Sequence, residues 1–219
     1  MLVPSSNTVM EVDFYRNLPQ NMTVHVSRMY LTETTVQGES EMLDVYFPKA
    51  LYDLATLKPH VIVFGCTSAG ALRGNDYDEQ LCKKIEEIGK CASVSIIKSA
   101  RLGIQKLGLK KLAIITPYID DLNKRIKKSF EDDGVEVVSI NGFGIDVNFE
   151  LASPTPEEIL RFAKERLAGT KADGVFISCT NFRSMEIYKQ LQKELGIPVL
   201  TSNQVSIEET IAKAKSLTV

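Results

Sequence analysis

The chain has 219 residues, of which 44% are hydrophobic and 25% are charged, a composition that is ordinary for a soluble globular protein. This length is enough for one large domain or two small ones with a substantial core. The net charge of −2 gives no electrostatic reason to expect a nucleic acid or an acidic membrane as a partner. No apolar run approaches the roughly 20 residues that span a bilayer, and no basic segment followed by an apolar run opens the chain, so we expect no signal peptide, no membrane contact and a cytoplasmic location.

Short apolar runs alternate with helical segments along the whole chain. Most of the runs are rich in Val and Ile and are apolar on both faces, as parallel strands covered by helices require. Strands are expected at residues 2–4, 23–30, 61–65, 93–96, 111–116, 136–140, 174–178 and 198–200. Helices are expected at residues 9–18, 41–57, 76–89, 119–133, 156–167, 184–195 and 202–217. This order predicts an α/β fold built from βαβ units.

The chain repeats one local pattern at an offset of 113 residues. Residues 61–68 read VIVFGCTS and residues 174–181 read GVFISCTN, so each apolar run ends in cysteine and threonine. The same offset carries Pro4 onto Pro117, each after a short apolar run. Such a repeat predicts two similar lobes that face each other across a shared cleft. We expect residues 1–95 plus 201–219 to form the first lobe and residues 96–200 to form the second.

The two repeated cysteines are the candidate catalytic groups. Cys66 and Cys179 each end an expected strand, the place where α/β sheets bind ligands, and a following helix would lower the pKa of the thiol. One thiol on each side of a substrate suits a reaction that attacks one face of a carbon and protonates the other. Cys82 and Cys91 lie in a helix and a connection, and we interpret them as structural thiols.

Motifs for cofactors are absent from the sequence. No Cys-x-x-Cys pair occurs, and only His25 and His60 are available as histidine ligands, so no metal site is expected. No glycine-rich nucleotide-binding motif occurs either. Small polar residues after the strands can instead present hydroxyl and N–H groups to an anion, which we expect to be a carboxylate.

Several other residues are ambiguous from sequence alone. Tyr118 either caps a strand end or donates its phenol O–H to a substrate carboxylate, and Asn7 reads as a helix cap that can also face a ligand. Asn148 reads by default as a turn residue. Arg73 and Arg183 follow the two cysteines and could attract an anion, although both are equally typical of surface. A non-catalytic protein that captures a small acid is an alternative at this point.

Five motifs resemble those of the aspartate/glutamate racemase superfamily, within it the maleate isomerase and arylmalonate decarboxylase branch. The resemblance runs in order from about residue 2 to residue 205. The motifs are VPSSNT at 3–8, GCTS at 65–68, TPY at 116–118 followed by LN at 122–123, NFE at 148–150 and SCTN at 178–181.

This resemblance implies two Rossmann-like lobes with parallel four-stranded sheets, related by a pseudo-twofold axis, with the active site in the cleft between them and no metal or organic cofactor. Cys66 would be the nucleophile or base and Cys179 its counterpart acid. The substrate carboxylates would be held by Asn7, Tyr118 and Asn148, with the backbone near Thr67, Ser68 and Thr180.

The expected reaction is the isomerisation of a small dicarboxylate, with maleate to fumarate as the leading case. An amino-acid racemase and an arylmalonate decarboxylase-like enzyme are the alternatives that the resemblance leaves open. Arylmalonate decarboxylases lack the first cysteine, and the presence of Cys66 therefore favours isomerase or racemase chemistry. We also expect a homo-oligomer, a dimer or larger.

Overall fold

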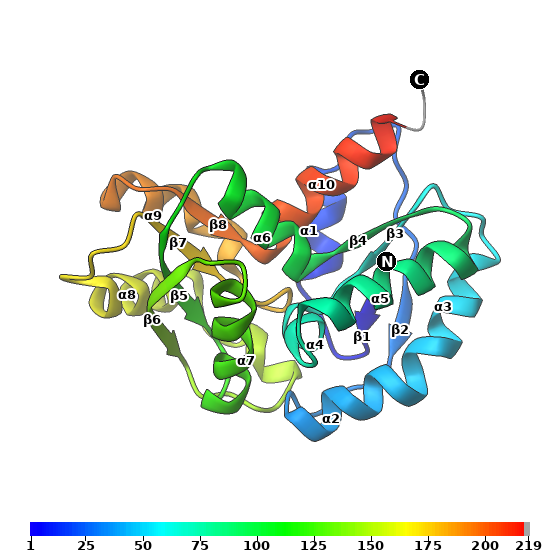
Figure 1. The fold of residues 1–219 in the computed structure, drawn as a ribbon, viewed down its shortest axis with the longest axis horizontal. Helices are drawn as coiled ribbons and strands as arrows, with labels where there is room; N and C mark the ends of the chain where they lie inside the picture. Colours follow the sequence, from blue (N-terminus) through cyan, green and yellow to red (C-terminus); the bar gives the residue numbers. More distant parts are fainter. Residues whose placement is uncertain (217–219) are drawn as a thin grey trace.

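The computed structural model describes residues 1–216, which form two parallel four-stranded sheets (Figure 1). The first sheet has the order β2-β1-β3-β4 and the second has the order β6-β5-β7-β8. The strands are β1 (Leu2–Pro4), β2 (Ser27–Met29), β3 (Val61–Phe64), β4 (Ala92–Ser95), β5 (Lys111–Thr116), β6 (Glu136–Gly142), β7 (Gly174–Ile177) and β8 (Val199–Thr201). The expected fold class, two α/β lobes with parallel four-stranded sheets, is confirmed.

The two sheets repeat one topology. Each begins with a central strand, places the next strand outside it, and then crosses to the other side for two further strands. The offset between equivalent strand starts is 113 for β3 and β7, at residues 61 and 174, and 107 for β4 and β8, at residues 92 and 199. It is 109 for β1 and β5, at residues 2 and 111, and for β2 and β6, at residues 27 and 136. The repeat that the cysteines revealed is therefore a repeat of whole strands, with an offset that varies by a few residues along the lobe.

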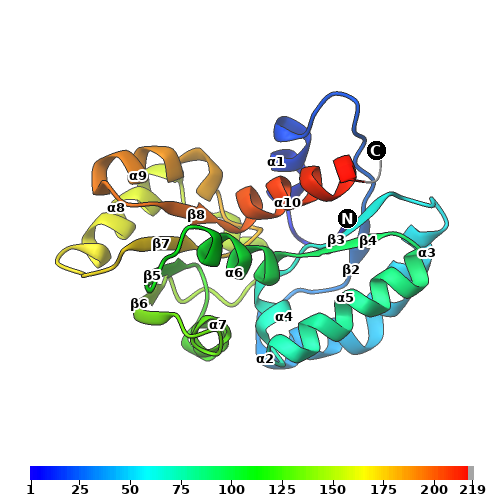
Figure 2. The same ribbon diagram turned by 45° about the horizontal axis from the view of Figure 1, so that its top comes forward.

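Helices cover both faces of the first sheet, as the apolar central strands β1 and β3 require. The helices α1 (Met10–Asn17) and α10 (Ser202–Ser216) lie on one face, and α3 (Phe47–Ala55) and α5 (Asn75–Gly89) lie on the other (Figure 2). Asn203 of α10 donates to the Asp13 carboxylate of α1 at 2.7 Å. The last helix thus returns to the first sheet after the chain has built the second.

The second sheet is covered by α7 (Asp120–Glu131) on one face and by α8 (Pro156–Leu167) and α9 (Tyr188–Leu195) on the other (Figure 2). A capping box starts α8, in which Thr155 and Glu158 exchange side-chain and backbone hydrogen bonds. The helix α6 (Ile96–Lys106) connects the two sheets and packs against α10 and the short helix α4 (Thr67–Ala71). The boundaries between the lobes stay a prediction.

Three of the expected elements differ from the structure by more than two residues at one end or both. The strand expected at 23–30 contains only Ser27–Met29. A helix was expected after Cys66 without bounds, and α4 is that helix, whereas α6 was not expected. The helix expected at 41–57 begins earlier, as α2 (Val36–Glu41), and passes through a wide π turn at Met42–Tyr46 before α3. Pro48 lies in the first turn of α3, and because its nitrogen cannot donate, the preceding turn does not continue as a regular α-helix. The helix expected at 184–195 is a 3-10 turn, Ser184–Glu186, followed by α9.

None of the helices within residues 1–216 combines the length and the apolar character that crossing a membrane requires. Residue 217, which we expected to close the last helix, lies outside the described residues.

Candidate active site

Cys66 and Cys179 follow equivalent strands of the two lobes. Cys66 comes two residues after the end of β3, behind Gly65, and Cys179 comes two residues after the end of β7, behind Ser178. A Cβ atom at Gly65 would lie 2.6 Å from the Met10 sulfur and 2.9 Å from the Leu2 carbonyl oxygen. Only glycine therefore fits directly before Cys66, where the end of β3 passes close to β1 and α1.

The backbone of Cys179 is strained. Its φ is 109°, a positive value that among the non-glycine residues of 1–216 is shared only by Lys58 and Lys90. Lys58 and Lys90 have φ near 50°, in the ordinary left-handed region, whereas 109° lies beyond it. Strain of this kind persists only where the surroundings hold it, and it gathers at functional sites.

Burial raises the pKa of both thiols, so the expected lowering is wrong for the enclosed site. Cys66 lies at the N-cap position of α4, and the backbone N–H of Ala69 and the Ser68 hydroxyl favour its thiolate. These donors are outweighed by burial and by the nearby Glu39 carboxyl, and the pKa of Cys66 lies well above its ordinary value. No α-helix begins at Cys179, and burial raises its pKa to about 12.

Tyr118 belongs to the same cluster as the two cysteines. Its phenol O–H donates to the Cys179 sulfur, an interaction that favours the Cys179 thiolate and opposes the burial. Burial also raises the pKa of Tyr118 well above its ordinary value, with further contributions from the charges of Cys179 and Cys66. The phenol therefore keeps its proton and acts as a donor.

Asn7 links the two lobes beside the cysteines. Its Nδ2 donates to Thr180 Oγ1 at 3.0 Å, and Thr180 Oγ1 donates to the Gly65 carbonyl oxygen at 3.0 Å. Its Oδ1 accepts from the backbone N–H groups of Val9 and Met10 and so caps the first turn of α1. One of the two Nδ2 protons is left over, and it can bind a ligand.

A second cross-lobe link runs through Asn148, which lies in a turn, as expected, and is buried. Its Oδ1 accepts from Ser6 Oγ at 2.9 Å, and its Nδ2 donates to Thr34 Oγ1 at 3.0 Å. The carbonyl of Asn148 accepts from Asn181 Nδ2 at 2.7 Å. Asn181 in turn donates its backbone N–H to the Cys179 sulfur at 3.2 Å, so this chain ends at a candidate catalytic thiol.

The hydroxyls of Thr67 and Ser68 are both engaged by residues that sequence reasoning missed. Thr67 Oγ1 and Ser202 Oγ are 2.9 Å apart, and Ser202 Oγ also accepts from the Cys179 backbone N–H at 2.9 Å. Ser68 Oγ lies 3.8 Å from the Cys66 sulfur and donates to the Glu39 carboxylate. Glu39 is fully buried in α2. An acidic residue on the apolar side of a helix, three and four residues before Met42 and Leu43, is the sequence signal that could have identified it.

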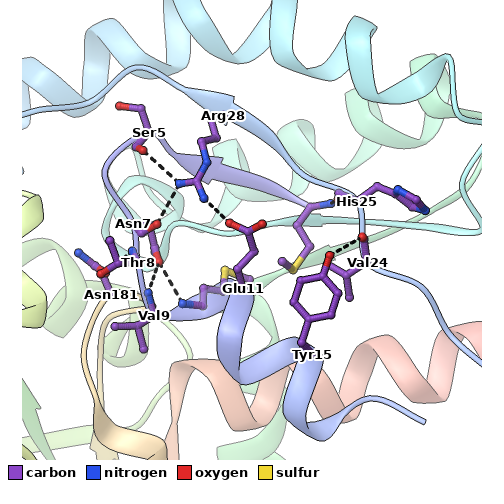
Figure 3. Close-up of polar contacts among 12 residues, drawn as sticks. Ser5, Asn7, Thr8, Val9, Glu11, Tyr15, Val24, His25, Arg28 and Asn181 are labelled. Carbon is purple, nitrogen blue, oxygen red and sulfur yellow. Dashed lines mark hydrogen bonds and ion pairs between the residues drawn. The ribbon is translucent and has the colours of Figure 1, made fainter. Parts of the chain in front are cut away.

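Arg28 fixes the loop that carries Asn7 (Figure 3). Its guanidinium donates to the carbonyl oxygens of Ser5 and Asn7 at 3.1 and 2.9 Å and pairs with the Glu11 carboxylate on α1. The Thr8 backbone N–H donates across the lobes to Asn181 Oδ1 at 2.9 Å. Ser5 to Thr8 also line an open hollow of 630 Å³, together with Arg28 and Phe149.

All the candidate site residues are brought together and enclosed. The most exposed of them is Cys66, at 5%. The candidates are Cys66, Cys179, Asn7, Thr67, Ser68, Tyr118, Asn148 and Thr180. A bridge between Glu33 and Val147 joins the two lobes beside Asn148. Arg73 and Arg183 do not join the cluster, because they pair with Asp44 and Glu186 at the surface.

The arrangement can bind a small anion through N–H and O–H donors and place a thiol of each lobe near it. No group of three or more His, Cys, Asp or Glu side chains in residues 1–216 is placed to hold a metal ion. The charge of Cys179 raises the pKa of Cys66, so the two sulfurs are close enough to influence one another.

Comparison with known proteins identifies the family. The arylmalonate decarboxylase family model matches residues 1–218. The chain belongs to this family. It is 28% identical to the maleate isomerase of Alcaligenes faecalis over 92% of this chain and 84% of that protein, and 29% identical to that of Geobacillus stearothermophilus over 92% and 85%.

A solved structure of the same family shares the fold. It is a mutant of the Nocardia farcinica maleate cis-trans isomerase with a covalently bound succinylcysteine intermediate. The two structures align with a TM-score of 0.89 at 18% identity, over 98% of this chain and 91% of the other.

Proposed function

We propose that the chain is a cofactor-independent isomerase of a small dicarboxylate, with the conversion of maleate to fumarate as the leading case. The observation that carries this proposal is the pair of buried thiols, Cys66 and Cys179, at equivalent strand ends of two facing lobes. The similarity to maleate isomerases over more than nine-tenths of the chain supports the choice of substrate.

In the proposed reaction the Cys66 thiolate adds to one alkene carbon of maleate. A C–S bond forms, and the π electrons move to the neighbouring carbon, where they spread into the adjacent carboxylate. The Cys179 thiol supplies a proton to that carbon, the single C–C bond rotates, and Cys179 takes the proton back as the C–S bond breaks. Fumarate leaves, and both thiols return to their starting states.

The donors around the thiols suit a substrate with two carboxylates. Asn7, Tyr118 and Asn148 would hold them, with Thr180 and the backbone near Thr67 and Ser68. Tyr118 hydrogen-bonds to Cys179, and we expect its phenol to donate to a substrate carboxylate that gains charge during the addition.

The first test is a substrate panel followed by NMR. We expect fumarate from maleate and no reaction of D- or L-aspartate or of phenylmalonate. Racemisation of aspartate would show that the two thiols exchange an α-proton instead, and loss of CO₂ from phenylmalonate would place the chain with the decarboxylases. Ligand-induced stabilisation without turnover of any of them would favour a small-acid binding protein and would overturn the proposal.

The thiols themselves are tested by four substitutions. Cys66→Ala and Cys179→Ala should each lower the rate of fumarate formation by several orders of magnitude, because nucleophile and proton donor act as a unit. Cys82→Ala and Cys91→Ala are the matched controls, and they should leave the rate nearly unchanged. If a control variant lost activity while Cys66→Ala kept it, the wrong pair of cysteines would have been assigned.

A homo-oligomeric state and a cytoplasmic location stay proposals from the sequence. Light scattering tests the first and cell fractionation tests the second.

A further inference from the structure

Glu39 is a buried acid beside the candidate nucleophile, and the proposed reaction gives it no role. Its side chain is 0% exposed, and its Oε1 accepts the hydroxyl proton of Ser68. Ser68 Oγ lies 3.8 Å from the Cys66 sulfur, within reach of a hydrogen bond to sulfur. The Glu39 carboxyl, the Ser68 hydroxyl and the Cys66 thiol therefore form a chain of polar contacts from α2 to the site.

The other oxygen of Glu39 shows which charge state this position favours. Glu39 Oε2 is buried and has no hydrogen-bond partner among the described residues. An ionised carboxylate with one unpaired oxygen in a dry interior is costly, whereas a protonated carboxyl places a hydrogen on one oxygen and removes the charge. Burial raises the pKa of Glu39 to about 8, in agreement with this geometry.

The charged groups around Glu39 do not compensate a negative charge on it. Its charge raises the pKa of Cys66, Cys179 and Tyr118, which face it from the site. The packed helix α4, Thr67–Ala71, carries no charged side chain. In the adjoining π turn Asp44 pairs with Arg73, and on α2 itself Glu41 accepts from Tyr46.

We propose that Glu39 is a positioning residue that shares one negative charge with Cys66 through Ser68, so that Cys66 becomes a thiolate only while Glu39 holds a proton. With Glu39 protonated, its O–H donates to Ser68 Oγ, and the Ser68 hydroxyl proton turns toward the Cys66 sulfur. With Glu39 ionised, Ser68 donates to Glu39, and a thiolate at Cys66 would face a second negative charge. The role of this pair in catalysis rests on the proposed function, but the shared charge does not.

The proposal predicts that the thiolate fraction of Cys66 stops increasing at high pH. As the pH rises toward 8, the thiolate fraction of Cys66 increases. Above that pH Glu39 loses its proton. The molecule then carries one negative charge, on Glu39 or on Cys66, and the ratio between these two forms does not depend on pH. In the Glu39→Gln variant the thiolate fraction of Cys66 should continue to increase with pH, because an amide cannot ionise. The amide N–H can donate to Ser68 in place of the protonated carboxyl.

The experiment measures the rate at which iodoacetamide labels Cys66 between pH 6 and 10, with peptide mapping by mass spectrometry and no substrate present. In the wild type we expect the rate to rise and level off near pH 8. In Glu39→Gln it should agree with the wild type within about threefold at pH 6.5 and exceed it by roughly tenfold at pH 9.5. Glu39→Ala, which lacks any donor to Ser68, should label more slowly than Glu39→Gln at every pH.

Asp78→Asn is the matched control. Asp78 is another buried acid of the first lobe, bonded to Ser95 Oγ at 2.6 Å and with one oxygen unpaired, but it has no contact with Cys66 among the described hydrogen bonds. This variant should keep the wild-type plateau. The proposal is overturned if Glu39→Gln levels off near pH 8 like the wild type, or if Asp78→Asn removes the plateau equally.

The pH dependence of kcat/KM for maleate separates this inference from the proposed function. Turnover with the same pH profile in wild type and Glu39→Gln would remove Glu39 from the reaction while leaving the isomerase standing. The expected labelling difference without turnover of maleate would leave the shared charge standing and overturn the isomerase.

Discussion

At the scale of single residues, the site is a set of small polar side chains whose chemistry is set by burial. The same enclosure that brings Cys66, Cys179 and Tyr118 together raises the pKa of all three, because each would have to carry its charge without water. The neutral forms therefore dominate the enclosed site. Hydrogen bonds from Ser68, Tyr118 and backbone N–H groups favour the thiolate that the proposed reaction requires.

Tyr118→Phe tests whether the phenol acts in the transition state. The substitution keeps the packed ring and removes the donor to Cys179 or to a substrate carboxylate, so kcat should fall more than KM rises. The increase in barrier should be about 2–4 kcal/mol, the range for loss of one oxyanion donor. Steady-state kinetics with maleate measures both constants. A large fall in melting temperature with normal kcat would show that the hydroxyl satisfies a structural partner instead.

Because the backbone of Cys179 is strained, we expect glycine to be more stabilising than alanine at this position, which reverses the usual order. At φ 109° a Cβ is unfavourable, so Cys179→Gly should be more stable than Cys179→Ala, by about 1 kcal/mol. At Cys66, where φ is −136°, the order should be the usual one, with alanine the more stable. Denaturant unfolding of the four variants measures the difference. Equal stability of the two variants at position 179 would contradict the strain.

At the scale of elements, the sequence predicted most accurately the bounds of helices and strands whose conformation is determined by neighbouring residues rather than by tertiary contacts. The bounds of β1, β5 and α8 agree with those expected, because α8 has its own capping box and the strands are short apolar runs with clear ends. The helix α6 and the bounds of α4 were missed because their N-cap residues, Ser95 and Cys66, lie at or just after the end of a strand rather than in a polar loop. Their helical conformation depends on packing between the two lobes.

The site residues that belong to the repeated pattern could be predicted from the sequence, whereas those outside it could not. Cys66 and Cys179 follow from the repeat, and Tyr118 and Asn7 stand at other strand ends. Glu39 and Ser202 have no repeated counterpart that marks them. The local pattern before Met42 and Leu43 predicts that Glu39 is buried. Its place beside Cys66, like the place of Ser202 beside Cys179, depends on how helices far apart in the chain meet.

Asn7→Ser separates the cap at the start of α1 from the contact across the lobes. Serine keeps an acceptor for the first turn, so the loss of stability should be smaller than for Asn7→Ala, where removal of a cap costs about 1 kcal/mol. Both variants lose the amide N–H that reaches Thr180, and both should lower kcat/KM for maleate to a similar degree, by roughly a hundredfold. Activity that instead follows stability across the two variants would mean that Asn7 is only a cap.

At the scale of the whole molecule, two copies of one topology place two thiols in a single enclosed site. The lobes are joined there by side-chain bonds rather than by a long linker, through Asn7 to Thr180 and Ser6 to Asn148, and by the bridge between Glu33 and Val147. The site is enclosed, and its most exposed candidate side chain is Cys66 at 5%. The contacts that form the site thus also help to hold the lobes together, in addition to the packing of α6 on α10 and of α4 on α7.

The most direct test of the two-thiol account is to trap the covalent intermediate. Cys179→Ser should be incubated with maleate, digested, and mapped by mass spectrometry. Because the variant keeps the nucleophile and weakens proton exchange on the opposite side, we expect a succinyl adduct on the peptide that contains Cys66, with Cys66→Ser as the control that carries none. An adduct on Cys82 or Cys91, or rapid fumarate formation by Cys66→Ser, would contradict the account.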